Sequence, residues 1–324
     1  MVEHGFEEPS ISTKTIWKEG DEATGAAKMD TVKIALVQMH CLRDPDDNIS
    51  CAEHEVRIAA SNYAELCVLP DVFSNRYVCQ FENVKKVLRD VPDHQRLVER
   101  FRGLAEEGQI AIVLPFIERI DQRRTFNSEV LIGKDGKVLG HYRKLHIPDS
   151  EGYREDLYFN PGDEGYVVTD LGGLKIGLGI CWDEWFPEMA RILTLKGAQL
   201  LVYPSAIGSE ISVPDFDSHP SWELVMRANA IVNRVFIAAT NRVGHEEVIN
   251  FYGGSLVVYP WGEVLTRASL RRPAIVYADL DLSQIDRANS FFGFLSTRRP
   301  DTYGDLAKKN RSPRARNVGR RVGS

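Results

Sequence analysis

The strongest constraint on the fold is an internal repeat. Two stretches of the chain carry the same order of strand-like and helix-like segments, ending in a hairpin. The corresponding pairs are "VKIALVQMHC" and "LKIGLGICWD", "YAELCVLPDV" and "GAQLLVYPSA", "QIAIVLPFIER" and "RVFIAATNRVG", and "NSEVLIGKDGKVLGHY" and "GGSLVVYPWGEVLTRA". The repeat predicts an α/β fold in which two sheets pack face to face, related by a pseudo-twofold, with helices outside.

Composition narrows the class of protein. The 324 residues are 43% hydrophobic and 27% charged, which is ordinary for a globular protein with a sizeable core. The net charge of −6 gives no indication of nucleic acid or an anionic membrane as a partner. No apolar stretch approaches the roughly 18 residues that cross a bilayer. We therefore expect a small-molecule ligand, no nucleic acid and no membrane.

Cysteine usage and the chain start indicate the compartment. The five cysteines are an odd number and form no C-x-x-C pair, which is typical of free thiols in a reducing compartment. The first 28 residues contain no apolar core of a secretory signal. The expected localisation is cytoplasmic. We divide the chain into a polar extension at 1–30, one domain at 31–304 and a basic tail at 305–324.

Three residues that can carry chemistry follow strand-like segments. Asp71 ends "VLPD", where it is either a solvated turn acid or a proton carrier. Cys181 sits on a sharp strand-to-helix turn, where exposure and a helix dipole could activate its thiolate. Lys144 could donate to a developing oxyanion if a pocket encloses it. Glu155 is either a loop acid or the group that orients Lys144. An acid, a lysine and a cysteine suit acyl transfer.

Long motifs then identify a resemblance. The segments are "YRKLHIPD", "GYREDLYFNPGD", "GICWDEWFPEMAR", "YPSAIGSE", "NRVG", "FYGGS" and "RRPDTY". From about residue 31 to 304 the chain resembles the carbon–nitrogen hydrolase (nitrilase) superfamily, and within it the N-carbamoylputrescine amidase group. The resemblance implies a four-layer αββα sandwich and a Glu-Lys-Cys triad with a second glutamate. Cys181, Lys144 and Glu155 match the nucleophile, the lysine and the second glutamate.

The general acid/base position departs from the family pattern. Where relatives have Glu after Leu-Pro, this chain has Asp71, whose carboxylate sits roughly 1.5 Å further back. A displacement of about 1 Å at a catalytic group can lower a rate on the order of 100-fold. Two readings stay open: an active amidohydrolase, or an impaired homologue that serves in binding or assembly.

The resemblance also implies a reaction. Cys181 attacks the carbonyl of a non-peptide C–N bond, a thioester forms, and Asp71 moves the protons, with no metal or organic cofactor. The expected substrate is a linear N-carbamoyl amine similar to N-carbamoylputrescine; an aliphatic amide or a nitrile is the alternative. Trp182, Glu184 and Glu210 are candidate substrate contacts, since a cationic tail needs a carboxylate. Glu188 is a further candidate. A homo-oligomer, a dimer or larger, is expected.

Overall fold

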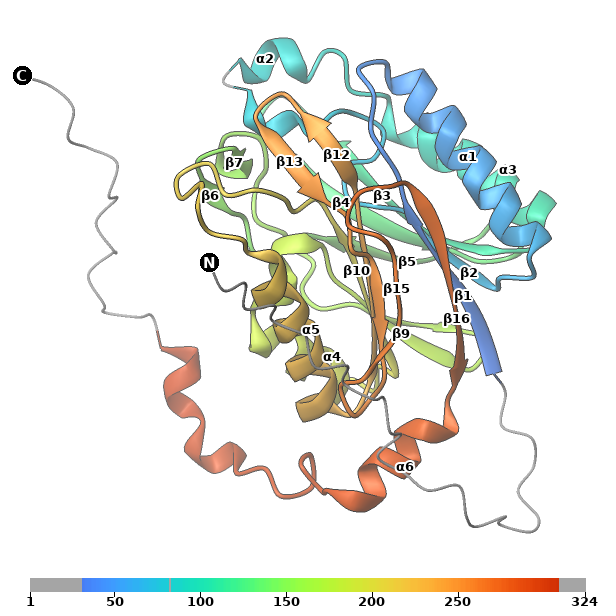
Figure 1. Cartoon of the computed structure of the whole chain (residues 1–324), viewed down its shortest axis with the longest axis vertical. Coiled ribbons are helices and arrows are strands. Elements are labelled where there is room, and N and C mark those ends of the chain that lie inside the picture. Colours follow the sequence, from blue (N-terminus) through green and yellow to red (C-terminus); the bar gives the residue numbers. More distant parts are fainter. Residues whose placement is uncertain (1–30, 82, 309–324) are drawn as a thin grey trace, which may run out of the picture.

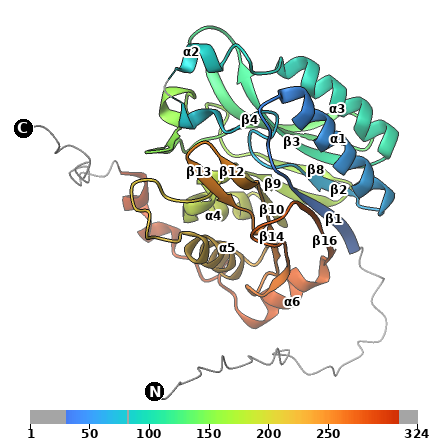
Figure 2. The same cartoon turned by 45° about the horizontal axis from the view of Figure 1, so that its top comes forward.

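Two six-stranded sheets pack face to face, and helices cover the outer face of each. The computed structural model describes residues 31–81 and 83–308. In Figures 1 and 2 the helices α1 (Pro45–Ser61) and α3 (His94–Gly108) lie outside one sheet, and α4 (Pro187–Leu195) and α5 (His219–Asn233) lie outside the other. The predicted four-layer αββα sandwich is confirmed.

The first sheet has the strand order β16-β1-β2-β3-β4-β5. Its central strands β1, β2 and β3 are parallel, and β16, β4 and β5 are antiparallel to their neighbours. Its strands are β1 (Thr31–Gln38), β2 (Leu66–Val68), β3 (Ala111–Arg119), β4 (Thr125–Ile132), β5 (Val138–Arg143) and β16 (Ala274–Asp281).

The second sheet reproduces this arrangement in the order β15-β14-β11-β10-β9-β8. The parallel strands are β9, β10 and β11, flanked by antiparallel β8 on one side and the β14–β15 hairpin on the other. Its strands are β8 (Val168–Leu171), β9 (Leu174–Leu178), β10 (Leu200–Ser205), β11 (Phe236–Asn241), β14 (Leu256–Val258) and β15 (Val264–Arg267). The internal repeat read from the sequence therefore corresponds to two sheets of the same strand order.

The helices begin where the sequence supplies caps. Asp44 and Asp93 accept backbone N–H groups at the starts of α1 and α3, and Pro187 occupies the first turn of α4. The helices are α1 (Pro45–Ser61), α2 (Val84–Val87), α3 (His94–Gly108), α4 (Pro187–Leu195), α5 (His219–Asn233) and α6 (Ser283–Phe291).

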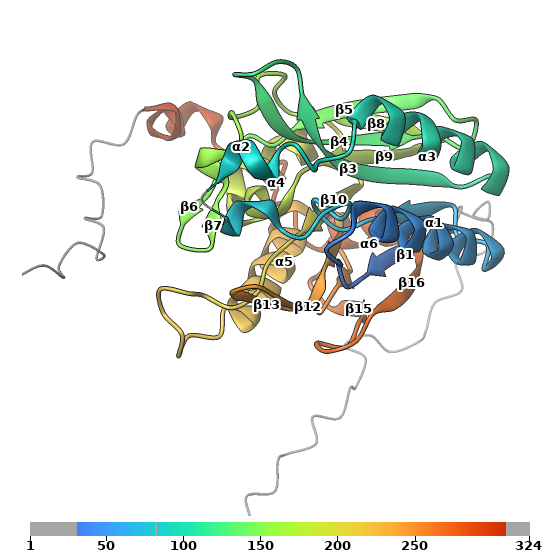
Figure 3. The same ribbon diagram turned by 90° about the horizontal axis from the view of Figure 1, so that it is seen from above.

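Smaller elements gather at one end of the sandwich. They are the hairpins β6 (Asp149–Ser150) with β7 (Tyr153–Arg154) and β12 (Val243–Glu246) with β13 (Ile249–Tyr252). Figures 1 and 3 place both hairpins at the same end as α2. An antiparallel bridge between Gly208 and Phe251 joins the loop after β10 to β13. This end of the sheets carries the candidate site.

The core follows from the alternation of side chains along the strands. Residues such as Leu36, Val68 and Val113 point between the sheets, whereas Val37, Cys67 and Ile112 point toward α1 and α3. Both faces of the central strands are buried, so these strands are continuous apolar runs. The two sheets are held at a fixed separation, which positions the groups at their ends.

Some expectations fall outside the described residues. The extension at 1–30 lies outside them, as does the basic tail from 309 onward. The division of the chain at residues 30 and 304 stays a prediction. Within 31–81 and 83–308 no helix combines the length and apolarity that crossing a membrane requires.

Candidate active site

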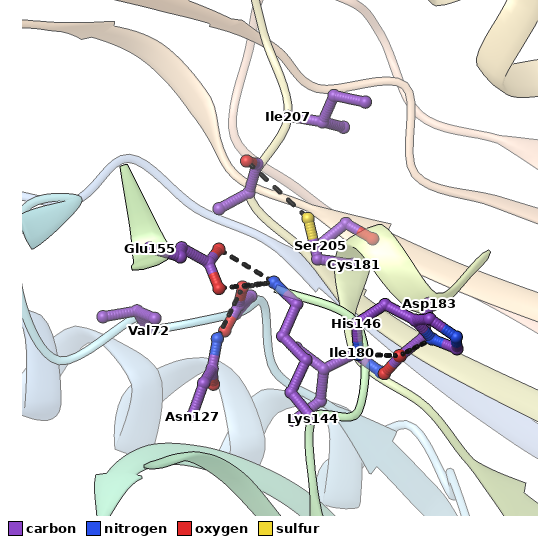
Figure 4. Close-up of polar contacts among 12 residues, drawn as sticks. Val72, Asn127, Lys144, His146, Glu155, Ile180, Cys181, Asp183, Ser205 and Ile207 are labelled. Atoms are coloured by element: carbon purple, nitrogen blue, oxygen red, sulfur yellow. Dashed lines mark hydrogen bonds and ion pairs between the residues drawn. The ribbon is translucent and has the colours of Figure 1, made fainter. Parts of the chain in front are cut away.

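Four side chains predicted from the sequence meet at one end of the two sheets. Asp71 follows β2, Lys144 follows β5, Glu155 follows β7, and Cys181 follows β9. Asp71, Lys144 and Glu155 are fully buried, and Cys181 is 6% exposed. Figure 4 shows the Lys144 amine pointing toward Glu155, on the side where Cys181 lies. Residues from both halves of the repeat thus share one enclosed site.

Lys144 is held by Glu155. Its Nζ donates to both carboxylate oxygens of Glu155 at 2.8 Å, and the Tyr77 hydroxyl donates to Oε1 of the same carboxylate at 2.8 Å. Burial alone would lower the pKa of Lys144, but the neighbouring Glu155, Cys181 and Asp71 raise it above its ordinary value. Lys144 is therefore a fixed cation at neutral pH.

Asp71 lies beside this pair without a close contact to the lysine. Its Oδ2 is 4.0 Å from Lys144 Nζ and accepts a hydrogen bond from the Asn127 amide at 3.3 Å. Its Oδ1 has no hydrogen-bond partner among the described residues. Burial raises the pKa of Asp71 to about 7, against the opposing effect of Lys144. An acid with this pKa can accept and return a proton near neutral pH.

Cys181 occupies a strained backbone position. Its φ is +46°, a left-handed conformation that non-glycine residues seldom adopt, and it opens a five-residue 3-10 helix at Cys181–Trp185. The Sγ atom is 3.9 Å from the carbonyl oxygen of Ala206. The sharp turn agrees with the sequence reading.

The expected exposure of Cys181 is wrong, because the residue is only 6% exposed, whereas activation of its thiolate by a helix dipole stays a prediction. Burial raises the pKa of Cys181 well above its ordinary value, and Lys144 opposes this only in part. The 3-10 helix that begins at Cys181 spans five residues, and α4 begins after it at Pro187. A thiol in this setting needs a base to remove its proton.

Asp183 connects the cysteine turn to the lysine segment, a role that the sequence reading missed. Its carboxylate accepts from the Ile180 backbone N–H at 3.0 Å and the Tyr142 hydroxyl at 2.7 Å. It also accepts the His146 backbone N–H at 3.0 Å and lies 2.7 Å from His146 Nδ1. The signal was an acid two residues after the cysteine, which reads equally well as a surface charge.

A cavity of about 440 Å³ opens onto Cys181 and Glu155, whereas Asp71 and Lys144 are not among its lining residues. Its lining consists of Tyr77, Pro148, Ser150, Tyr153, Glu155, Cys181, Trp182, Trp185, Ala206, Ile207, Glu210, Phe216, Ser218 and Ser221. Trp182 and Glu210, two of the four candidate substrate contacts, are in this lining. The described residues that line it include no lysine, arginine or histidine.

Glu184 is not among the lining residues, which argues against the expected substrate contact. It is fully buried, and its carboxylate accepts from the Ser205 hydroxyl at 3.0 Å and the Trp222 indole N–H at 2.6 Å. Burial raises the pKa of Glu184 to about 8, although both hydrogen bonds lower it. These hydrogen bonds tie the Cys181–Trp185 turn, to which Glu184 belongs, to β10 and α5. Glu188 lines a different, larger cavity between α4 and the C-terminal segment.

The site's chemistry is that of a protein nucleophile with a base and a cation. Among the described residues, no group of three or more His, Cys, Asp or Glu side chains is arranged to hold a metal ion. The absence of a cofactor stays a prediction. The arrangement allows a thiol to attack a carbonyl while a carboxylate takes its proton and a lysine faces the developing charge.

Comparison with known proteins adds independent information. Residues 33–290 match the carbon-nitrogen hydrolase family. The chain is 36% identical over 286 residues to citrullinase from Francisella tularensis, covering 87% of this chain and 100% of that protein. It is 38% identical over 288 residues to N-carbamoylputrescine amidase from Solanum lycopersicum, covering 86% of this chain and 95% of that protein.

Solved structures of carbon-nitrogen hydrolases and amidases have the same fold as this chain. A carbon-nitrogen hydrolase from Helicobacter pylori G27 superposes with a TM-score of 0.82 at 34% identity, covering 86% of this chain and 99% of the other. A variant of the amidase from Nesterenkonia sp. AN1 superposes with a TM-score of 0.69 at 27% identity, covering 83% and 94%. In that variant the acetamide moiety of fluoroacetamide is covalently attached to the active-site cysteine.

Proposed function

This chain belongs to the carbon–nitrogen hydrolase family and is an amidohydrolase, and we propose that its substrate is a linear N-carbamoyl amine with a cationic end. The products are the free amine, carbon dioxide and ammonia. The observation that carries this proposal is the composition of the cavity beside Cys181: aromatic walls, carboxylates, and no cationic side chain among the described lining residues.

Acylation begins at the cysteine. Cys181 Sγ attacks the carbonyl carbon as the Asp71 carboxylate takes the thiol proton, and the carbonyl oxygen becomes an oxyanion. Lys144 and a backbone N–H near Trp182 stabilise this oxyanion. The C–N bond then breaks, and the proton held by Asp71 passes to the departing nitrogen. Glu155 keeps Lys144 in place through its two 2.8 Å hydrogen bonds.

Deacylation uses the same groups in reverse. Asp71, ionised again, removes a proton from a water molecule that attacks the acyl carbon of the thioester. The C–S bond breaks, the proton returns to the thiolate, and the carbamate product decomposes to carbon dioxide and the remaining amine or ammonia. The pKa of about 7 suits Asp71 to both directions of proton transfer.

Two carboxylates line the cavity, and they have different tasks. Glu155 has both oxygens engaged with Lys144. Glu210 has no hydrogen bond or ion pair within the described part of the chain, so its carboxylate is available to a substrate ammonium group. Trp182 and Trp185, with ring centroids 6.2 Å apart, supply apolar wall for an alkyl chain.

The same lining argues against an amino acid substrate. Citrulline, the substrate named for one relative, carries an α-carboxylate as well as an α-ammonium group. A carboxylate in this cavity would meet Glu210 and the described lining offers no Arg or Lys to pair with it. N-Carbamoylputrescine carries only the ammonium group, which favours it.

A substrate panel tests the proposal. Ammonia release is measured with N-carbamoylputrescine, L-citrulline, a neutral aliphatic amide and an aliphatic nitrile. We expect kcat/KM to be at least tenfold higher for N-carbamoylputrescine than for the others, on the order of one charge-assisted hydrogen bond. Faster turnover of citrulline, the amide or the nitrile would overturn the substrate assignment. No turnover of any compound would favour the impaired homologue.

We also infer a cytoplasmic homo-oligomer. The α4–α5 layer exposes Leu195 and Val232, next to Phe294 and Leu306 of the C-terminal segment, and α5 also exposes Leu224 and Ile231. An exposed apolar face of this kind suits burial against a second copy. All five cysteines are free, which suits a reducing compartment. Light scattering tests the assembly: Leu224→Glu should lower the mass, and a wild-type monomer would contradict it.

A further inference from the structure

The backbone immediately after Asp71 is in a conformation that its sequence does not favour. Val72 has φ +50°, and its side chain is fully buried. A left-handed β-branched residue is a genuine conformational outlier. Such a conformation persists only where the surrounding structure holds it. The residues that hold it therefore determine where the Asp71 carboxyl lies.

The guanidinium of Arg242 makes those contacts. Its Nη2 donates to the carbonyl oxygens of Asp71 at 2.9 Å, Val72 at 2.8 Å and Asn75 at 3.2 Å. Arg242 directly follows β11 of the second sheet, and its side chain is fully buried. The turn that carries the acid on the first sheet is thus fixed from the second sheet.

Glu246 pairs with Arg242, and the two side chains together form what we call the clamp. Both of its oxygens accept from Arg242 Nη1, at 2.9 and 3.0 Å, and its Oε2 also accepts the backbone N–H of Tyr77 at 2.7 Å. The Tyr77 hydroxyl in turn donates to Glu155. The buried Arg242–Glu246 pair therefore holds both ends of the 71–77 segment, one bearing Asp71 and the other bearing the tyrosine that contacts Glu155.

We propose that Arg242 is a positioning residue for the reaction: it holds the left-handed turn at Val72 through which the Asp71 carboxyl faces Lys144 and Cys181. The planar fork of Arg reaches the three carbonyls and Glu246 together, which the single ammonium of Lys cannot do. The turn requires the hydrogen-bond geometry of the Arg242 guanidinium and not only its positive charge. The role deepens the proposed function and rests on it for its kinetic readout.

The test is Arg242→Lys, which keeps the positive charge near Asp71 and removes the fork. We expect kcat to fall about 10- to 100-fold, as for a displacement of about 1 Å, and KM to change less than twofold. Arg234→Lys is the matched control, because Arg234 is also buried but stacks on Phe294 at 4.4 Å, outside the cavity lining. It should keep the wild-type kcat. A kcat of Arg242→Lys within twofold of wild type overturns the proposal.

The variant Val72→Gly distinguishes a positioning role of Arg242 from a general effect on stability. Glycine adopts positive φ without strain, so the turn needs the clamp less. The fall in kcat that Arg242→Lys causes should be smaller when the protein also carries Val72→Gly. The ratio of kcat with Arg242→Lys to kcat with the native Arg242 should therefore lie closer to one in the Val72→Gly background than in the wild-type background. Equal ratios in the two backgrounds would mean that Arg242 acts only on stability, and would overturn the proposal.

Alkylation makes the test independent of the substrate. Iodoacetamide labelling of Cys181, followed by peptide mass analysis, should slow in Arg242→Lys, while the exposed Cys51 labels at the wild-type rate. If the wild-type protein turns over no compound in the panel, the proposed function fails. The positioning role is overturned separately, by a labelling rate of Cys181 in Arg242→Lys that equals the wild-type rate. Should Arg242→Lys not fold, Glu246→Gln replaces it, with a several-fold fall in kcat expected and a change below twofold overturning the proposal.

Discussion

Asp71 Oδ2 stops 4.0 Å short of Lys144 Nζ, although both side chains are fully buried in the same site. Glu155 reaches the same nitrogen at 2.8 Å with both oxygens. The distance of 4.0 Å exceeds hydrogen-bond range, so only the charge attraction operates between Asp71 and Lys144. Asp71 therefore lies in the site without a hydrogen bond to Lys144.

Lengthening this acid should speed the reaction. In Asp71→Glu the carboxylate advances roughly 1.5 Å, which brings an oxygen within hydrogen-bond reach of Lys144 and nearer to Cys181. We expect kcat on the N-carbamoyl amine to rise several-fold, measured by ammonia release. The control is Asp71→Asn, which keeps the shape and loses the base; kcat should fall about 100-fold or more. A lower kcat in Asp71→Glu would show that the turn is already matched to aspartate.

The pH profile should report the buried acid. Asp71 must be ionised to take the thiol proton, and burial raises its pKa to about 7 from the ordinary value of 3.8. The kcat/KM should therefore fall about tenfold per unit as pH drops below 7, and approach a plateau above it. An acid limb centred below pH 5 would contradict the assignment of Asp71 as the base.

Glu210 should govern affinity for the cationic end. Glu210→Gln is expected to raise KM for N-carbamoylputrescine about tenfold with little change in kcat, because it removes a charge-assisted hydrogen bond distant from the reacting carbonyl. The neutral amide should show no such change. Glu188→Gln, an exposed acid in the other cavity, serves as the matched control. Equal effects on the charged and neutral substrates would remove Glu210 from the recognition site.

Glu129 should weaken the fold as pH rises. It is fully buried on β4, and neither carboxylate oxygen has a hydrogen-bond partner among the described residues. Burial, with Asp183 and Asp71 nearby, raises its pKa well above 4.5. A raised folded-state pKa means that the protonated acid is tolerated at low pH and that stability is lost as pH rises through that pKa.

Replacing Glu129 by an apolar residue should therefore stabilise the protein. We expect Glu129→Leu to raise the free energy of unfolding at pH 8 by about 1–3 kcal/mol, with a smaller gain below pH 5. Glu129→Gln, which keeps a buried polar group, should gain less. Urea unfolding at both pH values measures this. A Glu129→Leu protein less stable than wild type at pH 8 would point to a partner that satisfies the carboxyl.

The sheets could be predicted from the sequence because their signal is repeated. Each half presents three buried parallel strands and a hairpin in the same order, and the structure pairs them in the same order. Cys181, Lys144 and Glu155 lie in long family motifs, so their convergence was expected. Asp71 was located by its place after Leu-Pro at a strand end.

The residues that hold the catalytic side chains in position could not be predicted in the same way. Arg242 and Glu246 are four residues apart in "NRVGHEE", a pattern that usually indicates an exposed ion pair, yet both are buried. Val72 is β-branched, which gives no indication of a left-handed backbone. Glu184 resembled a substrate ligand, but its carboxylate is buried and accepts hydrogen bonds from Ser205 and Trp222. Each depends on contacts between residues far apart in the chain, which local patterns do not contain.

The division of the site between the sheets has a kinetic consequence for folding. Asp71 and Lys144 follow strands of the first sheet, Cys181 and Arg242 follow strands of the second, and neither sheet alone holds the set. Turnover on refolding therefore requires both sheets to be folded and docked, and regain of activity should not precede the recovery of secondary structure.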